Sequence, residues 1–287
     1  MTQRNAFLRL SGLLVIVALA MPGCASVKKM FGGGDDDAAM EAMTAEQLYA
    51  QARASMTGGN WARAEQHFER LMAQYPYGEY TEQALMEMAY AQYKAGKHEE
   101  SISTIDRFLR TYPTHRNVPY IYYLRGLVNS GRDTIFLQRV WTLDPSRRDL
   151  AAPRQAYSDL NTVVTRYPNS RYADDARARM ADLVDLFARH EIETALYYLR
   201  RGAWVAAATR AEYLLETYPE SMYRHDAIAV IGESHVQLGN EALAASARAQ
   251  LQSEAPQHDW LRGANWPDYP WAIRRLNPFA PERSPLD

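Results

Sequence analysis

Few residues of this chain have the types and spacing that catalysis or metal binding requires. His190 and Glu191 begin like the zinc motif HExxH, but Thr194 stands where the second histidine would be. No Gly-x-Ser-x-Gly segment is present to hold a nucleophilic serine, and the other histidines have no paired ligand spacing. Three glycines precede Asp35, yet no Gly-Lys-Ser/Thr follows them to bind phosphate. The sequence therefore predicts no catalytic residues, no metal ligands and no bound cofactor, and hence no enzyme.

The first residues predict export from the cytoplasm. An apolar run from Leu10 to Met21 follows Arg4 and Arg9, and no acidic residue occurs before Asp35. This charge layout is typical of a secretory signal peptide. The run is too short to span a bilayer, because a transmembrane helix needs about 20 apolar residues. We therefore interpret residues 1–23 as a removable leader.

The single cysteine, Cys24, directly follows that leader. The Gly23-Cys24 step resembles the lipobox of bacterial lipoproteins, whose cysteine carries lipid, although Met21 and Pro22 stand where Leu and a small residue are usual. The alternative is an ordinary thiol after a plain leader. Because no second cysteine is present to form a disulfide, we favour a covalent lipid on Cys24 as a membrane anchor. Residues 24–43, rich in glycine and aspartate, then form a flexible tether.

The composition of the chain fits a folded and nearly neutral body. The chain has 287 residues, of which 47% are apolar, and its formal net charge is -2. This length supports one large domain or two small ones. No long basic block is present, so we expect no binding to nucleic acid.

A repeated tyrosine-proline step indicates how the body is organised. Each step ends an amphipathic run with the period of a helix, which the proline then terminates. Five helices are therefore predicted to end at these positions. The steps are Tyr75-Pro76, Tyr112-Pro113, Tyr167-Pro168 and Tyr218-Pro219, with Ala255-Pro256 as a degenerate fifth.

Small residues occur at fixed distances before each of these prolines. One small residue lies 12 positions before the proline, a second lies another 12 positions earlier in four repeats, and a glycine lies 17 positions before the proline in the same four. Small residues let two helices approach closely, and glycine tolerates the positive φ of a tight turn. The unit is therefore a helix, a turn and a helix. The first set is Ala64, Ser101, Ala156, Ala207 and Ala244, the second is Ala52, Ala89, Ala195 and Gly232, and the turn glycines are Gly59, Gly96, Gly202 and Gly239.

The pattern resembles the tetratricopeptide repeat, with Trp61 and Trp204 on the turn side and Phe68 at the aromatic position of the second helix. The resemblance implies an all-α fold, a right-handed superhelix of about five helix pairs. We expect two blocks joined by a long helix. Repeats 1 to 3 occupy residues 44–168, with an insertion at about 132–153, and repeats 4 and 5 occupy residues 169–256.

The last segment, residues 257–287, is rich in tryptophan and proline. Trp260, Trp266, Trp271 and Phe279 make it too apolar for an idle tail. We expect it either to fold back on the last repeat or to bind another subunit.

Tyrosine is the prevalent aromatic residue, with 19 tyrosines against 7 phenylalanines. A tyrosine ring is apolar and its hydroxyl seeks a partner, which suits half-buried binding surfaces. First helices line the concave side of such a superhelix, so tyrosines there predict a groove for an extended, unfolded polypeptide. The alternative is packing between repeats, which we expect to be the only role of about half of them. The candidates are Tyr80, Tyr90, Tyr93, Tyr120, Tyr122 and Tyr123.

Two segments that a generic repeat does not require, YPTHRN at residues 112–117 and RGAWVAAATR at residues 201–210, resemble the BamD family. These are lipoproteins of the machinery that inserts β-barrel proteins into the bacterial outer membrane. The resemblance extends from Thr44 to about Pro256. It implies a non-enzymatic scaffold that is lipid-anchored at the periplasmic face of the outer membrane.

The same resemblance implies partners. The N-terminal repeats would receive unfolded outer-membrane proteins, and the C-terminal repeats would dock the periplasmic domain of BamA, alongside other lipoproteins of the complex. Arg210 matches the family arginine that serves this docking, and small side chains at Ala206–Ala208 would let a partner approach. The alternative is that Arg210 is an ordinary solvent-facing helix residue.

Two other functions stay open at this point. One is a different periplasmic tetratricopeptide-repeat adaptor that links cell-wall synthesis to envelope constriction; loss of outer-membrane barrels on depletion would distinguish the two. The other is an enzyme without a recognisable motif, which hydrolase assays on cell-wall or peptide substrates would detect.

Overall fold

A computed structural model describes residues 43–131, 149–263 and 266–267. The described residues form ten α-helices and no strand. Contacts divide the protein into unit 1, which ends at Pro113, and unit 2, which begins at Thr114. The all-α fold is confirmed. The superhelical arrangement of all five pairs stays a prediction, because each unit is described by itself.

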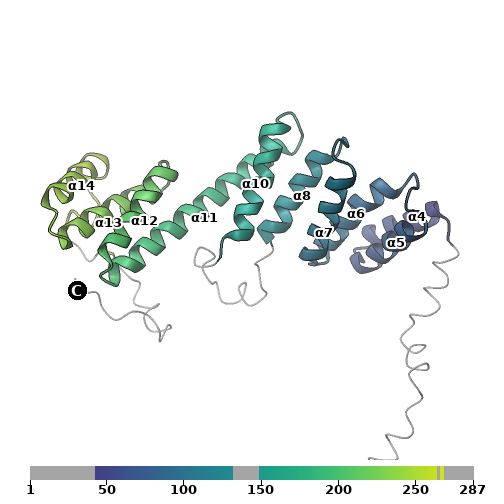
Figure 1. Cartoon of the computed structure of the whole chain (residues 1–287), viewed down its shortest axis with the longest axis horizontal. Coiled ribbons are helices and arrows are strands. Elements are labelled where there is room, and N and C mark those ends of the chain that lie inside the picture. Colours follow the sequence, from purple (N-terminus) through teal and green to yellow (C-terminus); the bar gives the residue numbers. More distant parts are fainter. Residues whose placement is uncertain (1–42, 132–148, 264–265, 268–287) are drawn as a thin grey trace, which may run out of the picture. The chain divides into compact units, whose positions relative to one another are not determined.

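Unit 1 consists of two helix pairs. They are α4 (Ala45–Thr57) with α5 (Trp61–Gln74), and α6 (Thr81–Lys94) with α7 (His98–Thr111). Each helix packs on the next one along the sequence (Figure 1). The first helix begins at a capping box, in which the Thr44 hydroxyl accepts from the Gln47 amide and the Gln47 side chain accepts from the Thr44 amide.

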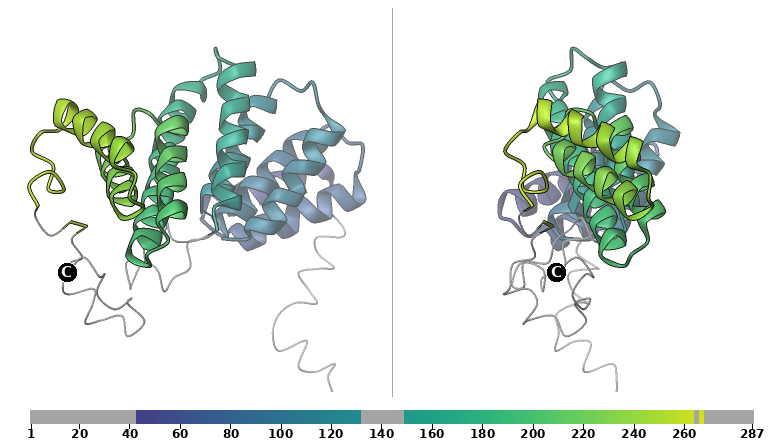
Figure 2. Two further views of the ribbon diagram at one scale, coloured as in Figure 1. Left: turned by 60° about the vertical axis from the view of Figure 1, so that its left-hand side comes forward. Right: turned by 90° about the vertical axis from the view of Figure 1, so that its left-hand side faces the viewer.

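Unit 2 continues the same pattern with three pairs. They are α8 (Val118–Gly131) with α10 (Ala151–Arg166), α11 (Ala173–Arg200) with α12 (Trp204–Thr217), and α13 (Arg224–Gln237) with α14 (Glu241–Glu254). Consecutive helices again lie side by side, and α11 also contacts α13 (Figure 2). At 28 residues, α11 is the long helix that the sequence predicts before Gly202.

The four turn glycines have the predicted backbone. Their φ angles are 73° at Gly59, 77° at Gly96, 71° at Gly202 and 73° at Gly239. Side chains with a Cβ rarely adopt this left-handed conformation, whereas glycine adopts it without steric cost. Each of these glycines therefore ends one helix and lets the backbone reverse into the next.

The small residues lie where the paired helices touch. Ala64 and Ala207 are fully buried, Ala89 is 1% exposed and Ala244 is 8% exposed. The repeat register predicted from the sequence is confirmed. Each second helix also ends one residue before the tyrosine or alanine that precedes the proline, at Gln74, Thr111, Arg166, Thr217 and Glu254.

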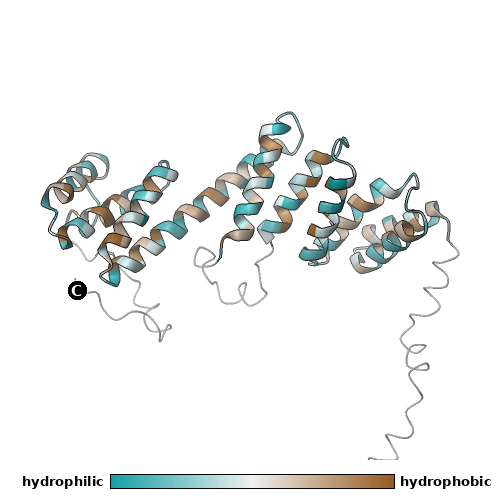
Figure 3. Ribbon diagram, viewed as in Figure 1, coloured by the Kyte–Doolittle hydropathy of each residue, from teal (hydrophilic) through white to brown (hydrophobic). Residues whose placement is uncertain are grey.

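Apolar and polar residues alternate around the helices (Figure 3). The apolar sides form the core of each unit, which in unit 2 includes Leu160, Ile192, Leu199 and Leu214. The exposed sides are mostly polar. The first helix of each pair follows the same amphipathic pattern, and the candidate binding tyrosines were predicted on these first helices.

The border between the two units differs from the predicted one. It falls between Pro113 and Thr114 rather than between residues 168 and 169. The reason is that α10 packs on both α8 and α11, so the third pair belongs with the pairs that follow it. The long helix thus lies inside unit 2. Within the predicted insertion at 132–153, α10 already begins at Ala151, while residues 132–148 lie outside the described residues.

The start of the tail folds back on the last repeat. Trp260 is 8% exposed, and its indole N–H donates to Glu233 at 2.8 Å. The indole N–H of Trp266 donates to Asp226 at 3.1 Å. Both partners lie on α13, so these two tryptophans follow the first of the two alternatives considered for the tail. Trp271 and Phe279 lie outside the described residues.

Candidate functional site

The first tyrosine group lies on α6 in unit 1. Tyr80 is the N-cap residue of this helix, and Tyr90 and Tyr93 lie on its later turns. All three are half-buried. Tyr80 stacks on Tyr49 of α4, with ring centroids 5.0 Å apart, and Tyr90 meets the indole of Trp61 edge-on at 6.0 Å. Packing between repeats 1 and 2 therefore holds Tyr80 and Tyr90, the alternative considered for these residues, while part of each ring stays accessible.

A buried carboxylate shares the α6 surface with these tyrosines. Glu87 is 8% exposed. Its Oε1 atom accepts hydrogen bonds from the Tyr49 hydroxyl at 3.1 Å, from Arg53 Nη1 at 2.6 Å and from Gln83 Nε2 at 2.7 Å. Burial, followed by the charge of Glu87, raises the pKa of Tyr49 to about 12. The Tyr49 hydroxyl therefore stays protonated and remains a hydrogen-bond donor at neutral pH.

Glu87 was not among the residues predicted from the sequence. Its signal is a charged residue inside the apolar run LMEMAYA at residues 85–91. A carboxylate at a buried helix position must be paired, because unpaired burial of a charge is very costly. The two partners on α4, Tyr49 and Arg53, could not be read from the sequence.

The second tyrosine group lies on α8 in unit 2 and comprises Tyr120, Tyr122 and Tyr123. Tyr172, the N-cap residue of α11, lies against two of them, with ring centroids 5.1 Å from Tyr123 and 5.5 Å from Tyr120. The Tyr123 hydroxyl donates to Asp175, and this hydrogen bond is the main reason why the pKa of Asp175 is lowered. All three α8 tyrosines are half-buried.

Tyr122 packs beside a buried ion pair. The guanidinium carbon of Arg125 lies 5.3 Å from the centre of the Tyr122 ring. Arg125 donates to Asp159 twice, from Nε at 3.1 Å and from Nη2 at 2.7 Å. Asp159 is 1% exposed, and burial raises the pKa of its carboxyl although Arg125 acts in the opposite direction. The pair joins α8 to α10 and holds the Arg125 guanidinium against the Tyr122 ring.

The six predicted tyrosines are thus all half-buried on first helices, but they form two groups in separate units. Each unit is described by itself, so a single groove through all six stays a prediction. Cys24, the predicted lipidation site, lies outside the described residues.

Arg210 lies on α12 and binds within the protein. Its Nη1 atom is 3.1 Å from Oε2 of Glu191 on α11, whose side chain is 3% exposed. The Arg210 side chain is 46% exposed, so its guanidinium lies half in solvent. This pairing also explains the HExxH-like fragment, because the glutamate holds an arginine instead of serving zinc chemistry. Arg210 is therefore more than a free surface charge.

The alanines before Arg210 were predicted to let a partner approach, but two of them are buried. Ala207 is fully buried and Ala208 is 5% exposed. Both pack inside the protein, because α12 lies between α11 and α13 and needs small residues at these contacts. The expectation that Ala206–Ala208 admit a partner is wrong for these two positions, and only Ala206 is half-buried.

Most of the exposed large apolar side chains belong to the last two repeats. Tyr75 and Tyr77 of unit 1 are exposed, and every other exposed large apolar residue in the described part of the protein lies between residues 197 and 243. They are distributed over α11, α12, α13, α14 and the segment between α12 and α13. The residues are Tyr197, Val205, Tyr213, Met222, Val236, Leu238 and Leu243.

The described residues contain neither a metal-binding cluster nor a helix that could cross a membrane. No group of three or more His, Cys, Asp and Glu side chains among them is placed to hold a metal ion. Of the helices in this part of the protein, none combines the length and apolar character needed to cross a bilayer.

The helix pairs, turn glycines and buried small residues define a tetratricopeptide-type helical-repeat protein. Solved structures of low similarity include MamA, with 14% identity and a TM-score of 0.32 over 73% of this chain and 90% of that one. Another is the TPR2AB domain of yeast Sti1 in its pHSP90 complex, with 13% identity and a TM-score of 0.39 over 76% and 80%. Because these scores are low, the assignment rests on the helix pairs themselves.

The particular family follows from the sequence comparisons. A family model described as "Outer membrane lipoprotein" (YfiO) matches residues 41–251. The "Outer membrane protein assembly factor BamD" of Xylella fastidiosa Temecula1 is 56% identical over 287 residues, which cover 99% of this chain and 96% of the relative. The protein of that name from Neisseria meningitidis Z2491 is 37% identical over 90% of this chain and 96% of its own. The chain belongs to the BamD family.

Proposed function

We propose that this protein is a non-enzymatic scaffold of the outer-membrane β-barrel assembly complex, held at the periplasmic face of the outer membrane by lipid on Cys24. Membership in a family whose curated relatives are named outer-membrane protein assembly factors supports the proposal. The helical-repeat fold supports it too, because stacked helix pairs present long surfaces for binding other proteins. Family membership favours this function over the cell-wall adaptor.

The observation that carries the substrate-binding part is the exposure of the first-helix tyrosines. Their rings are anchored on one side by neighbours such as Tyr49, Trp61 and Tyr172. A ring held in this way loses little side-chain entropy when a partner binds. Strands of barrel proteins alternate apolar and polar residues, so an extended segment has one apolar face that could meet the rings, while its backbone polar groups meet the hydroxyls.

Site-specific photocrosslinking tests this part. Crosslinkers at Tyr90 and Tyr122 are expected to capture newly exported barrel proteins in intact cells. Matched crosslinkers at Arg110 of α7 and Asn161 of α10, both exposed on second helices, serve as controls. Capture from the second-helix positions alone would contradict the proposal.

In this proposal repeats 4 and 5 bind BamA, and Arg210 lies at the contact. The supporting observations are the exposed apolar residues from Tyr197 to Leu243 and the half-exposed guanidinium of Arg210. A carboxylate of the partner could share this guanidinium, because arginine has five N–H donors. Truncating one member of a buried interfacial charge pair costs about 2 to 5 kcal/mol.

Two substitutions separate docking from internal stability. Arg210→Gln removes the guanidinium from the surface, whereas Glu191→Gln weakens the same internal pair but leaves the guanidinium in place. Co-purification of BamA from solubilised membranes is expected to fall with the first substitution and to persist with the second. Equal losses with both would mean that Arg210 acts only by holding α12 on α11.

The anchor has its own test. Cys24→Ser is expected to release an intact folded body from membranes washed with high salt and carbonate, because the wash disrupts docking to other proteins and the covalent lipid is the only direct tie to the bilayer in this proposal. Persistence of the variant in membranes washed with high salt and carbonate would contradict the lipid anchor.

A further inference from the structure

Arg154 of α10 is an exposed arginine that packs on an aromatic ring instead of pairing with a carboxylate. Its guanidinium carbon lies 5.2 Å from the centre of the Phe187 ring on α11. Phe187 is 5% exposed, and Tyr157 of α10 meets its ring edge-on at 6.1 Å. Within the described part of the protein, Arg154 takes part in no ion pair. A fixed position and an unpaired charge suit this guanidinium to binding an acidic group of another molecule.

A second guanidinium lies beside the first. Phe187 and Glu191 are four positions apart on α11, so they share one side of the helix, about 6 Å apart along its axis. Arg154 lies over the first of them, and Arg210 pairs with the second. Tyr218, directly after α12, is close to both places: burial mainly raises its pKa, while Arg154 lowers this pKa and Glu191 raises it. Helices α10 and α12 therefore place two guanidiniums about one helix turn apart over α11.

The positive charge of this pair exceeds its internal counter-charge. Glu191 Oε2 lies 3.1 Å from Nη1 of Arg210, and the Glu191 side chain is 3% exposed. This contact uses one of the five N–H donors of Arg210, and both arginines are exposed. Two positive charges thus face solvent above one buried negative charge. Carboxylates complement such a surface, because arginine can bind each of them with two parallel hydrogen bonds.

Tyr213 adds an aromatic surface at the same place. It follows Arg210 by three positions on α12, so the two side chains lie on the same side of the helix. Tyr213 is 39% exposed, and its ring meets the Tyr218 ring edge-on at 6.4 Å. Tyr218 is only 9% exposed, so it anchors a ring that is itself partly open to solvent. Tyrosine and arginine are enriched among the residues that contribute most to binding at protein interfaces.

We infer that Arg154 and Tyr213 belong to the docking site around Arg210, and that this site binds a segment with two carboxylates about 6 to 7 Å apart. Residues one turn apart on a helix, or two positions apart on a strand, have this spacing. One carboxylate accepts from Arg154 and the other from Arg210, while an apolar side chain of the same segment packs on Tyr213. The inference rests on the proposed docking of BamA through repeats 4 and 5, and it specifies the chemistry of the BamA surface that is bound.

Binding of the purified periplasmic domain of BamA to the full-length protein in lipid nanodiscs tests the inference, with the Kd measured at several NaCl concentrations. Arg154→Gln is expected to weaken binding about tenfold or more at low salt, since hydrogen bonds to a charged group are lost. It should also flatten the decline of affinity with salt, because one charge contact fewer is screened. Arg154→Lys keeps the charge without the planar fork, so it should retain the salt dependence and part of the affinity.

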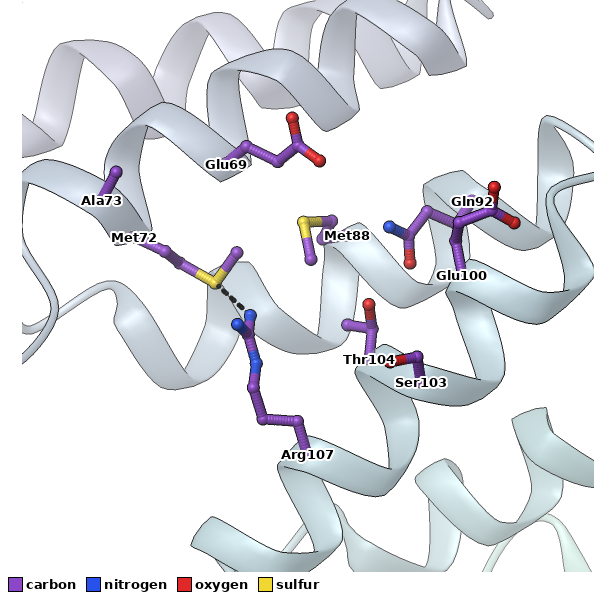
Figure 4. A pocket seen from close by; sticks show the side chains of 9 residues that line it. All are labelled: Glu69, Met72, Ala73, Met88, Gln92, Glu100, Ser103, Thr104 and Arg107. Carbon is purple, nitrogen blue, oxygen red and sulfur yellow. Dashed lines mark hydrogen bonds between the residues drawn. The ribbon is translucent and has the colours of Figure 1, made fainter.

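Two arginines outside this surface serve as matched controls. Arg248 of α14 is also exposed, and its guanidinium carbon lies 5.0 Å from the centre of the Trp260 ring. Arg107 of α7 in unit 1 is exposed as well, and its Nη2 atom lies 3.1 Å from the sulfur of Met72 at a hollow between α5 and α7 (Figure 4). Arg248→Gln and Arg107→Gln are expected to leave the affinity and its salt dependence unchanged. Equal effects of all three glutamine substitutions would mean diffuse attraction of charges and would overturn the specific site.

The aromatic part and the two-carboxylate part have separate readouts. Tyr213→Ala is expected to weaken binding, whereas Tyr213→Phe keeps the ring and should bind like the unsubstituted protein; undiminished binding by Tyr213→Ala would remove Tyr213 from the site. Acidic residues of the BamA domain, replaced one at a time by their amides, should include one that couples to Arg154→Gln and a different one that couples to Arg210→Gln in double-mutant cycles. A single acidic residue that couples to both would contradict the two-carboxylate segment.

The outcomes distinguish the inference from the docking itself. Loss of binding with Arg210→Gln but not with Arg154→Gln would overturn the inference and leave the proposed docking intact. No binding by the unsubstituted protein would overturn the docking and, with it, the inference. Hydrogen exchange of α10 and α12 reports the folding of each variant. Weaker binding of Arg154→Gln with faster exchange and an unchanged salt dependence would mean that Arg154 only holds α10 on α11, which also overturns the direct contact.

Discussion

Trp260 packs on Gly232. Gly232→Ala is therefore expected to destabilise the protein while Trp260 is present and to stabilise it when Trp260 is replaced by alanine. A Cβ atom added at Gly232 of α13 would lie 2.3 Å from Cη2 of Trp260 and 2.9 Å from both Cζ2 and Cζ3. Real atoms do not approach so closely, so the indole must move or the helices must separate. Gly232→Ala therefore tests whether the tail rests on α13.

The expected magnitudes follow from two opposing effects. Alanine is a better helix former than glycine by about 1 kcal/mol. Overpacking a contact costs about 1 to 3 kcal/mol, and displacing the ring fully forfeits more, since deletion of a buried indole costs about 3 to 5 kcal/mol. The ring is also held by the bond to Glu233 and by Arg248, whose guanidinium lies 5.0 Å from its centre. With Trp260 present, Gly232→Ala should destabilise the last repeat by up to about 2 kcal/mol.

With Trp260→Ala the obstacle is absent. Gly232→Ala should then stabilise the protein by up to about 1 kcal/mol, so the coupling between the two positions equals the overpacking cost of about 1 to 3 kcal/mol. Hydrogen exchange of α13 and α14 is the suitable assay, because stacked repeats lose cooperativity and their ends open locally. Urea unfolding of the whole protein is the second measurement. A stabilising effect of Gly232→Ala in both backgrounds would refute the contact.

Three further outcomes are expected. Ala64→Leu should destabilise unit 1 by about 1 to 3 kcal/mol in chemical denaturation, because Ala64 is fully buried where two helices meet. Asp159→Ala should cost about 3 to 5 kcal/mol in the same assay, since it removes the buried carboxylate that accepts two hydrogen bonds from Arg125, whose side chain is only 18% exposed. Hydrogen bonds from Arg224 lower the pKa of Glu254 from 4.5 to about 2, so its stabilising contribution, complete above pH 4.5, is lost as the pH falls through about 2. An NMR titration of the Glu254 carboxyl should show this midpoint, and Arg224→Ala should move it upward.

The repeat register could be predicted from the sequence because it depends on local requirements. A turn with positive φ needs glycine, as at Gly59 and Gly202, and closely paired helices need small residues, as at Ala64 and Ala207. Proline then marks the end of each second helix. These constraints recur at fixed spacing, so each repeat confirms the others.

The buried charges could not be predicted in the same way. Carboxylates on amphipathic helices are usually solvated, yet Glu87, Asp159 and Glu191 are buried. Their partners are distant in sequence, as Arg125 is from Asp159, and which helices meet is decided by packing. The border between the units was misplaced for the same reason, since the sequence does not show that α10 contacts both α8 and α11.

Those buried charges connect the scaffold to its binding surfaces. Glu87 holds Tyr49, on which Tyr80 stacks, while the partner of Glu191 is Arg210 itself. A buried ion pair adds little net stability compared with an apolar pair of the same shape, because desolvation offsets the attraction. It does fix orientation, since both members must keep their hydrogen bonds. We therefore infer that these pairs set the positions of the exposed aromatic and guanidinium groups. Replacing Glu87 with Gln keeps the shape of the side chain. It should then change the positions of the Tyr49 and Tyr80 rings more than it changes the arrangement of the helices.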